Sequence, residues 1–197
     1  MSIDLHMKRL GNIVFVVNLA LGFAGCAFTN KLQTIPASFS VEGKEESVVI
    51  GRMITVHGTF LGAKPLGFFD RLSSMELTVG NETTGKIFIV VCDQSGSDSN
   101  FYVALPPGRY RLAELRRSSG EREFQEAVEK VVFTSPPIGR FEVGKGQVIY
   151  IGTLKLEYRG FLHNWQVENE YEDVVKSFRE RYPHLNQEIV KALVQLE

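Results

Sequence analysis

Residues 101–112 read Phe-Tyr-Val-Ala-Leu-Pro-Pro-Gly-Arg-Tyr-Arg-Leu and predict two β-strands joined by a short connection. Apolar side chains alternate with other residues on both sides of it, which is the pattern of a half-buried strand. These apolar positions are Phe101, Val103, Leu105, Tyr110 and Leu112. Pro-Pro-Gly interrupts the alternation with turn-forming residues. The apolar phase then shifts to Ala113 and Leu115, which predicts a β-bulge in the second strand.

Further strands are predicted on both sides of this stretch. The apolar run 87–92 is expected to be central because both of its faces are apolar, and Cys92 at its end is expected to be a buried core residue. Short strands separated by Gly and Pro, without helical crossovers, predict a mainly β fold, an antiparallel β-sandwich. The other predicted strands lie near residues 48–56, 75–79, 131–133, 141–143, 147–158 and 161–167.

A C-terminal helical hairpin over 169–197, packed against the sandwich, is predicted from a change to helical spacing. Asn169 is expected to cap the first helix and Pro183 to stop it, and Asn186 is expected to cap the second. The alternative is that the pair is presented to a partner. The apolar residues of the two helices are Tyr171, Val174, Val175 and Phe178, then Ile189, Val190, Leu193 and Val194.

The N-terminal residues 7–26 have the layout of an export signal. Lys8 and Arg9 precede an apolar run over 13–23, and this run is shorter than the ~20 residues that a stable membrane span needs. Translation is expected to start at Met7 rather than Met1.

The end of this segment, Phe23-Ala24-Gly25-Cys26, resembles the lipobox of bacterial lipoproteins, although Phe23 replaces the usual leucine. The resemblance implies cleavage before Cys26, a diacylglyceryl thioether on its sulfur and an amide-linked acyl chain such as palmitate. Two or more chains hold a protein stably in a membrane. Ala27 implies an outer-membrane location facing the periplasm if the source is Gram-negative. The alternative is an uncleaved signal anchor, or a buried helix with an ordinary cysteine.

Four segments are therefore predicted. Residues 1–25 form a signal peptide, 26–46 a lipidated N-terminus and mobile tether, 47–168 the β-sandwich and 169–197 the C-terminal helices.

A second resemblance supports the fold. Residues 105–112 resemble the Leu-x-Pro-Gly-x-Tyr-x-Leu turn and strand of transthyretin-like and carboxypeptidase-regulatory-like sandwiches, and 147–154 resemble a strand of uncharacterised bacterial lipoproteins. These families imply a binding, stalk or accessory module.

Composition and motifs narrow the function classes. A net charge of -1, from 22 basic and 23 acidic residues, argues against a nucleic-acid binder. The sequence contains no Gly-x-Ser-x-Gly, no HExxH and no cysteine spacing typical of zinc sites, so no catalytic residue, metal or cofactor is expected. A non-enzymatic protein is predicted, and a hydrolase is disfavoured.

Two surface features remain candidates. The loop 58–72 contains Phe60, Leu66, Phe68 and Phe69, which are expected either to cap the sandwich or to form a contact patch. Arg109 and Arg111 share one face of a strand, where they either bind an anion or are neutralised by nearby glutamates.

The sequence as a whole predicts a lipid-anchored cell-envelope protein of the accessory or interaction type. Its partners are expected to be the membrane, through the N-terminal acyl chains, and another envelope protein. The alternative is a carrier that holds a small apolar or lipid ligand inside the sandwich and admits it through the 58–72 loop.

Overall fold

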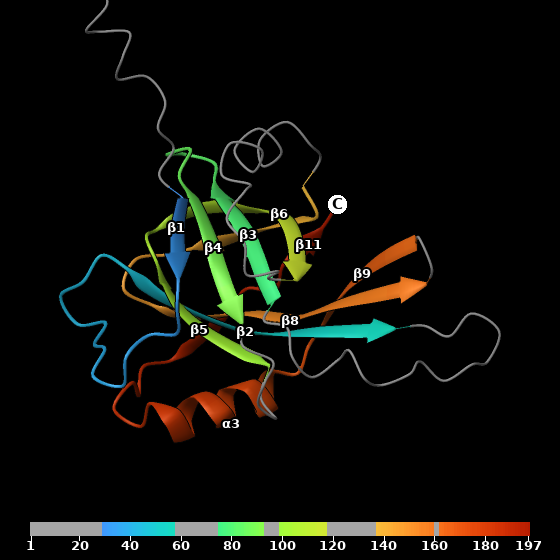
Figure 1. Cartoon of the computed structure of the whole chain (residues 1–197). Helices are drawn as coiled ribbons and strands as arrows, with labels where there is room; N and C mark the ends of the chain where they lie inside the picture. Colours follow the sequence, from blue (N-terminus) through green and yellow to red (C-terminus); the bar gives the residue numbers. More distant parts are fainter. Residues whose placement is uncertain (1–28, 58–74, 93–98, 118–136, 160–161) are drawn as a thin grey trace, which may run out of the picture.

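The computed structural model describes residues 29–57, 75–92, 99–117, 137–159 and 162–197, which form a mainly β protein with two mixed sheets (Figure 1). Sheet A contains, in spatial order, β1 (Thr29–Leu32), β4 (Ile87–Cys92), β3 (Met75–Asn81), β6 (Gly108–Arg117), β7 (Gly139–Val143) and β11 (Gln195–Leu196). Sheet B contains, in spatial order, β10 (Ile189–Lys191), β8 (Val148–Arg159), β2 (Ser47–His57) and β5 (Asn100–Leu105), and β9 (Leu162–Glu168) also pairs with β8. The strands predicted from periodicity within these ranges are confirmed.

The expectation of purely antiparallel sheets is wrong. The pairs β1–β4, β2–β8 and β10–β8 are parallel, whereas the other strand pairs are antiparallel. The parallel pairing of β2 with β8 accompanies the burial of both strands on their two faces, which is typical of parallel strands covered on two sides. Val49 and Ile149 face the core shared with sheet A, whereas Val48 and Val148 belong to a second cluster on the opposite face.

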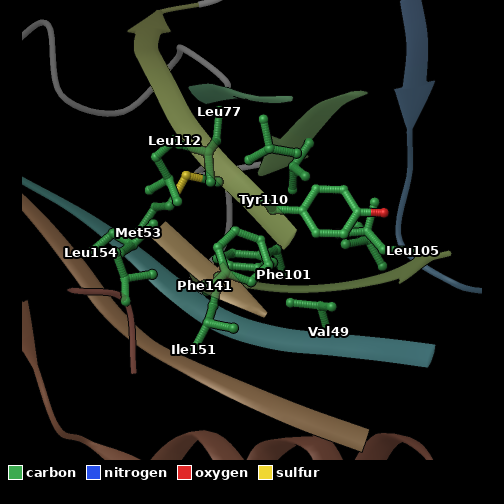
Figure 2. Close-up of a cluster of buried hydrophobic side chains, with 14 of the residues drawn as sticks. Val49, Met53, Leu77, Phe101, Leu105, Tyr110, Leu112, Phe141, Ile151 and Leu154 are labelled. Carbon is green, nitrogen blue, oxygen red and sulfur yellow. The ribbon is translucent and has the colours of Figure 1, made fainter. Parts of the chain in front are cut away.

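The two sheets share one hydrophobic core, part of which Figure 2 shows. Met53 and Phe101 of sheet B and Leu112 of sheet A are at most 1% exposed. The ring of Tyr110 stacks on that of Phe141 with centroids 5.4 Å apart. The core is therefore filled by the side chains of both sheets where the structure describes them.

The stretch that decides the fold does not form a hairpin. β5 belongs to sheet B and β6 to sheet A, so Pro106 and Pro107 carry the chain from one sheet to the other. The Tyr110 hydroxyl donates a 2.7 Å hydrogen bond to the carbonyl oxygen of Pro106, which fixes this corner. Cys92, at the end of β4, is 1% exposed, as predicted, and donates to the carbonyl of Ser99.

Two irregularities redirect the strands. The bulge predicted in β6 is confirmed, because Val79 pairs with Leu112 while Thr78 pairs with Glu114, so that Ala113 is the extra residue. A second shift, which the sequence analysis did not predict, separates the pairs Ile50–Tyr150 and Arg52–Thr153 in β2 and β8. Gly152 lies at this shift with a φ of 106°.

The helix α3 (Tyr171–Arg181) covers the face of sheet B that points away from sheet A (Figure 1). Val174 and Phe178, one turn apart on the helix, are fully buried in the second cluster, beside Tyr102 and Tyr150. Acidic residues in the first turn and basic residues in the last turn complement the helix dipole. The helix ends at Arg181, just before Pro183, as predicted.

The prediction of a C-terminal helical hairpin is wrong in its second half. The residues expected in a second helix instead form β10 and β11, which add to sheet B and sheet A respectively. Ile189 is buried and Val190 is 39% exposed, so the two neighbours face opposite ways, as in a strand. Asn169 is not the cap of α3 either. Glu170 occupies that position, without a side-chain capping bond.

The predicted tether is also corrected over residues 29–46. Residues 29–32 form β1 beside β4, and the chain then buries Ile35, Phe39 and Val41 in the cluster beneath α3. The backbone N–H of Ile35 donates to the carbonyl of Tyr102 at 2.8 Å. Because these apolar residues lack regular spacing, periodicity could not reveal their burial.

Candidate functional site

One end of sheet A combines the start of the described chain with exposed cations. This end, called the β1 end, comprises the start of β1 at Thr29, the β3–β4 turn over residues 82–86, and Arg109 at the start of β6. Thr29 pairs with Ile87, the first residue after the turn. The start of β1 and the turn accordingly lie side by side in Figure 1.

The turn is held rigidly by the buried side chain of Asn81. Its Oδ1 atom accepts hydrogen bonds from the backbone N–H groups of Thr83, at 3.0 Å, and Thr84, at 2.9 Å. The Asn81 N–H donates to the carbonyl of Lys86, and the N–H of Gly85 donates to the carbonyl of Asn81, both at 2.9 Å. This side-chain capping is the usual role of Asn in a turn.

The turn is also fastened to β6. The backbone N–H of Glu82 donates to the carbonyl of Arg109 at 2.8 Å. A Cβ atom at Gly108 would lie 2.5 Å from Nδ2 of Asn81, so only glycine permits this approach. The exposed side chains of Lys86 and Arg109 are thus carried on one fixed backbone framework.

The two predicted anion-binding arginines lie on the outward face of β6. Arg109 is exposed opposite Glu142, and Arg111 is half-buried opposite Arg140 on β7. Arg140 is neutralised by Glu82, at 2.8 Å, and by Glu197. Among the described residues, neither Lys86 nor Arg109 forms an ion pair, so their charges face solvent.

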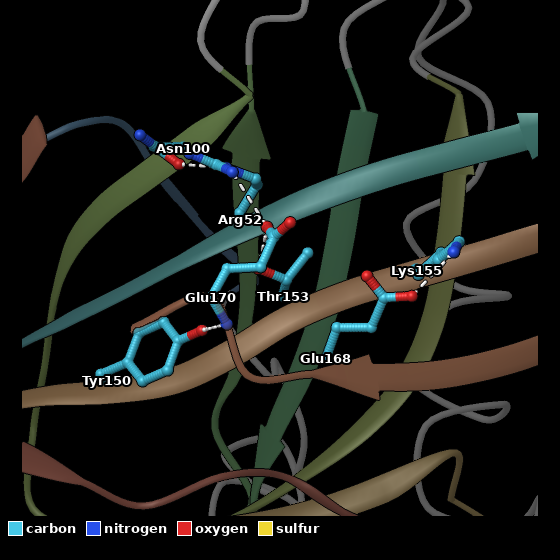
Figure 3. A network of polar contacts seen from close by, with 7 residues as sticks. All are labelled: Arg52, Asn100, Tyr150, Thr153, Lys155, Glu168 and Glu170. Atoms are coloured by element: carbon cyan, nitrogen blue, oxygen red, sulfur yellow. Dashed lines mark hydrogen bonds and ion pairs between the residues drawn. The ribbon is translucent and has the colours of Figure 1, made fainter. Parts of the chain in front are cut away.

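A separate polar network lies where α3 begins (Figure 3). Arg52 donates from Nε to Oδ1 of Asn100 at 2.8 Å and from Nη1 to Oε2 of Glu170 at 2.9 Å. Thr153 donates to the same carboxylate oxygen at 2.8 Å. The N–H of Glu170 donates to the Tyr150 hydroxyl at 2.9 Å.

This network fastens α3 to sheet B at the Gly152 irregularity. The Glu170 carboxylate is engaged by Arg52 and Thr153, which explains why it does not cap its own helix. Burial raises the pKa of Tyr150, so its hydroxyl stays protonated at neutral pH. The charges of Arg52 and Glu170 compensate one another, and the network links the start of α3 to β2, β5 and β8.

The neighbouring pair Lys155–Glu168 joins β8 to β9 at 2.7 Å (Figure 3). The hydrogen bond from the Lys155 ammonium to Glu168 raises the pKa of Lys155. Within the ranges that the structure describes, no group of three His, Cys, Asp or Glu side chains is placed to hold a metal ion. No helix of the same ranges is long and apolar enough to cross a membrane.

Several sequence predictions fall outside the described residues. They are the signal peptide 1–25, the lipidation residue Cys26, the strand 131–133 and the loop 58–72 with Phe60, Leu66, Phe68 and Phe69. Lys86 is the residue of the β1 end that the sequence analysis missed, because only the fold brings it beside the start of β1. A search with known protein-family models and with curated proteins finds no match to this chain.

Proposed function

We propose that the protein is a lipid-anchored, non-enzymatic module of the cell envelope, attached to a membrane by acyl chains on Cys26 and acting through interaction with another envelope component. For a Gram-negative source, its place is the outer membrane, facing the periplasm. The two sheets that share a core, and the corner fixed by Tyr110, support a sandwich-like unit of the transthyretin-like or carboxypeptidase-regulatory-like type.

The observation that carries the proposal is the position of Thr29. Thr29, the first residue of β1, is the third residue after Cys26, which ends the segment with export-signal character. Only Ala27 and Phe28 thus lie in the sequence between the residue proposed to be acylated and β1. Each buried methylene of an acyl chain contributes ~0.8 kcal/mol to membrane binding, so two or three chains on one sulfur and one amine suffice for stable attachment.

The packing of the core favours an interaction module over the carrier alternative. A carrier holds its ligand in a cavity lined by apolar side chains. In the described part of both sheets, the residues that face each other are close-packed, with Met53 and Leu112 at 0% and Phe101 and Tyr110 at most 1% exposed. These side chains occupy the space that an apolar ligand inside the sandwich would need.

Substitution of Cys26 tests the anchor, with the protein's other cysteine as a matched control. We expect Cys26→Ser to abolish incorporation of radiolabelled fatty acid and to release the protein from membranes. Cys92→Ser should retain both properties, because a serine hydroxyl can keep the hydrogen bond that Cys92 donates to Ser99. Equal fatty-acid labelling of the wild type and Cys26→Ser would refute the proposed attachment.

The same variant separates the interaction module from the carrier. Cys26→Ser carries no covalent lipid in the proposal, so lipid that co-purifies with it must be bound non-covalently. We expect organic extraction and mass spectrometry of the purified variant to find far less than one lipid per chain. One lipid per chain would favour the carrier instead.

A further inference from the structure

We propose that the β1 end rests on the membrane surface, with Lys86 and Arg109 facing the phosphate headgroups of the lipids. This inference rests on the proposed acylation of Cys26. It replaces a domain on a long mobile tether by one that is held against the bilayer in a fixed orientation.

The chain between Cys26 and β1 is too short to hold the folded unit far from the membrane. Two residues, Ala27 and Phe28, lie between Cys26 and Thr29, and the three Cα-to-Cα steps span at most about 11 Å when fully extended. The headgroup region of one leaflet is itself about 5–8 Å thick. A sulfur whose acyl chains enter the hydrocarbon therefore holds the start of β1 within or just above the headgroups.

β1 and the residues that follow it are held in the fold and do not lengthen this connection. β1 pairs with β4 over four consecutive residues, and Lys31 of β1 forms a 2.9 Å ion pair with the buried Glu76 of β3. Beyond β1, Ile35 is buried and bonded to Tyr102. To release more chain, β1 would have to detach from β4, which would break this pairing and expose apolar side chains. The paired β1 therefore limits the distance between Cys26 and the folded unit.

The place of β1 in sheet A determines which end of the folded unit faces the membrane. The start of β1 lies beside the 82–86 turn, so this turn and Arg109 are the parts of sheet A nearest to the point of attachment. The helix α3 lies at the other end of the molecule in Figure 1. Attachment at Thr29 thus places residues 82–86 next to the lipid and α3 away from it.

The β1 end carries positive charges that suit an anionic membrane surface. Lys86 and Arg109 are exposed and form no ion pair within the described residues, whereas Arg140 is already neutralised. Glu142 and Glu82 are exposed carboxylates near them, and Glu82 is paired with Arg140. A basic residue close to an anionic membrane contributes about 1 kcal/mol, and guanidinium and ammonium groups both bind phosphate. The short connection therefore sets the orientation, and the two cations reinforce it.

Site-specific fluorescence quenching tests this orientation on the lipidated full chain. Thr83→Cys places a label on the turn, and Lys176→Cys places one on the exposed face of α3. The native thiols interfere little, because Cys92 is buried and Cys26 is acylated in the proposal. The protein is reconstituted in vesicles of phosphatidylcholine and phosphatidylglycerol that contain a headgroup spin label.

We expect at least threefold stronger quenching of the label at residue 83 than at residue 176. Insertion of ten Gly and Ser residues between Ala27 and Phe28 should reduce quenching at 83 to near the level at 176, because such a linker extends the mean reach to about 20 Å. Lys86→Gln combined with Arg109→Gln should weaken quenching at 83 in anionic vesicles, whereas Lys176→Gln should not.

The mass of the N-terminal peptide from the same samples separates the two proposals. An unacylated Cys26 would overturn the proposed function. An acylated Cys26 with equal quenching at 83 and 176, or with quenching at 83 that the inserted linker leaves unchanged, would overturn the orientation while leaving the anchor intact.

Discussion

The phenolic hydroxyl of Tyr182 donates a 2.7 Å hydrogen bond to the carbonyl oxygen of Ile35, and both residues are at most 5% exposed. This bond joins the end of α3 to the segment that follows β1. The Tyr182 ring also contacts Tyr102 at a centroid distance of 5.6 Å, so one side chain links the end of α3 and the segment after β1 to sheet B.

Tyr182→Phe tests this link. Removal of the hydroxyl leaves the buried carbonyl of Ile35 without this donor, and we expect a loss of about 1–2 kcal/mol in the free energy of unfolding, measured by urea denaturation. Tyr171→Phe is the matched control, since its half-buried hydroxyl makes a longer bond of 3.2 Å to Ile189. An equal loss in both variants would contradict a special role for Tyr182.

Glu170→Gln tests the polar network at the start of α3. Glutamine keeps the shape of the side chain but loses the charge that Arg52 binds, so we expect a loss of about 1–2 kcal/mol in the free energy of unfolding. Glu172→Gln, on the exposed side of the same helix turn, should cost less than about 0.5 kcal/mol. A Glu170→Gln protein as stable as the control would show that the network contributes no stability.

Gly152→Ala tests the irregularity in β8. The new Cβ would lie 2.7 Å from Cγ1 of Val167, at a φ of 106° that L residues rarely adopt. We expect destabilisation of about 2–4 kcal/mol by thermal or urea unfolding. Gly43→Ala shares a positive φ but meets no atom within 4 Å, and it should cost only about 1 kcal/mol. The reverse order of the two losses would refute the argument from space.

Stability should fall in alkaline solution. Burial raises the pKa of Tyr110, Tyr150 and Tyr182 above the value of about 10 that tyrosine has in the unfolded chain. Their contribution is therefore fully present below pH ~10 and is lost as the pH rises towards the folded-state pKa values, because the unfolded chain releases these protons first.

Urea denaturation between pH 8 and pH 11 measures this loss, and the absorbance at 295 nm follows ionisation. We expect Tyr110, Tyr150 and Tyr182 to ionise only when the protein unfolds. The decline should be smaller in Tyr182→Phe, which has one buried phenol fewer. Titration of all six tyrosines near pH 10 in the folded state would contradict the prediction.

Local patterns predicted most of the strands but not how they pair. Alternation placed the described strands other than β1, β10 and β11 and located the bulge at Ala113, because both depend on which face of a strand is apolar. The parallel pairing of β2 with β8 depends on strand direction, which alternation does not encode. The burial of both strands on two faces becomes visible only once α3 and sheet A are in place.

The tail illustrates how tertiary contacts override periodicity. Ile189, Val190, Leu193 and Val194 have a spacing that also suits a helix. The free edges of β8 and β7 nevertheless capture this segment as strands, and the resulting hydrogen bonds decide its conformation. The β1 end could not be predicted as a site for a related reason, since Lys86 and the start of β1 meet only through the parallel pair β1–β4.

The pairing of Val48 with Val148 has a consequence for biogenesis. The chain is synthesised from its N-terminus, so the centre of sheet B cannot close until β8 has left the ribosome, and the edge of sheet A awaits residues 195 and 196. Contacts so distant along the chain form slowly. A newly made chain thus leaves these parts of the two sheets unpaired for most of its synthesis, which is the state that the proposed export would require.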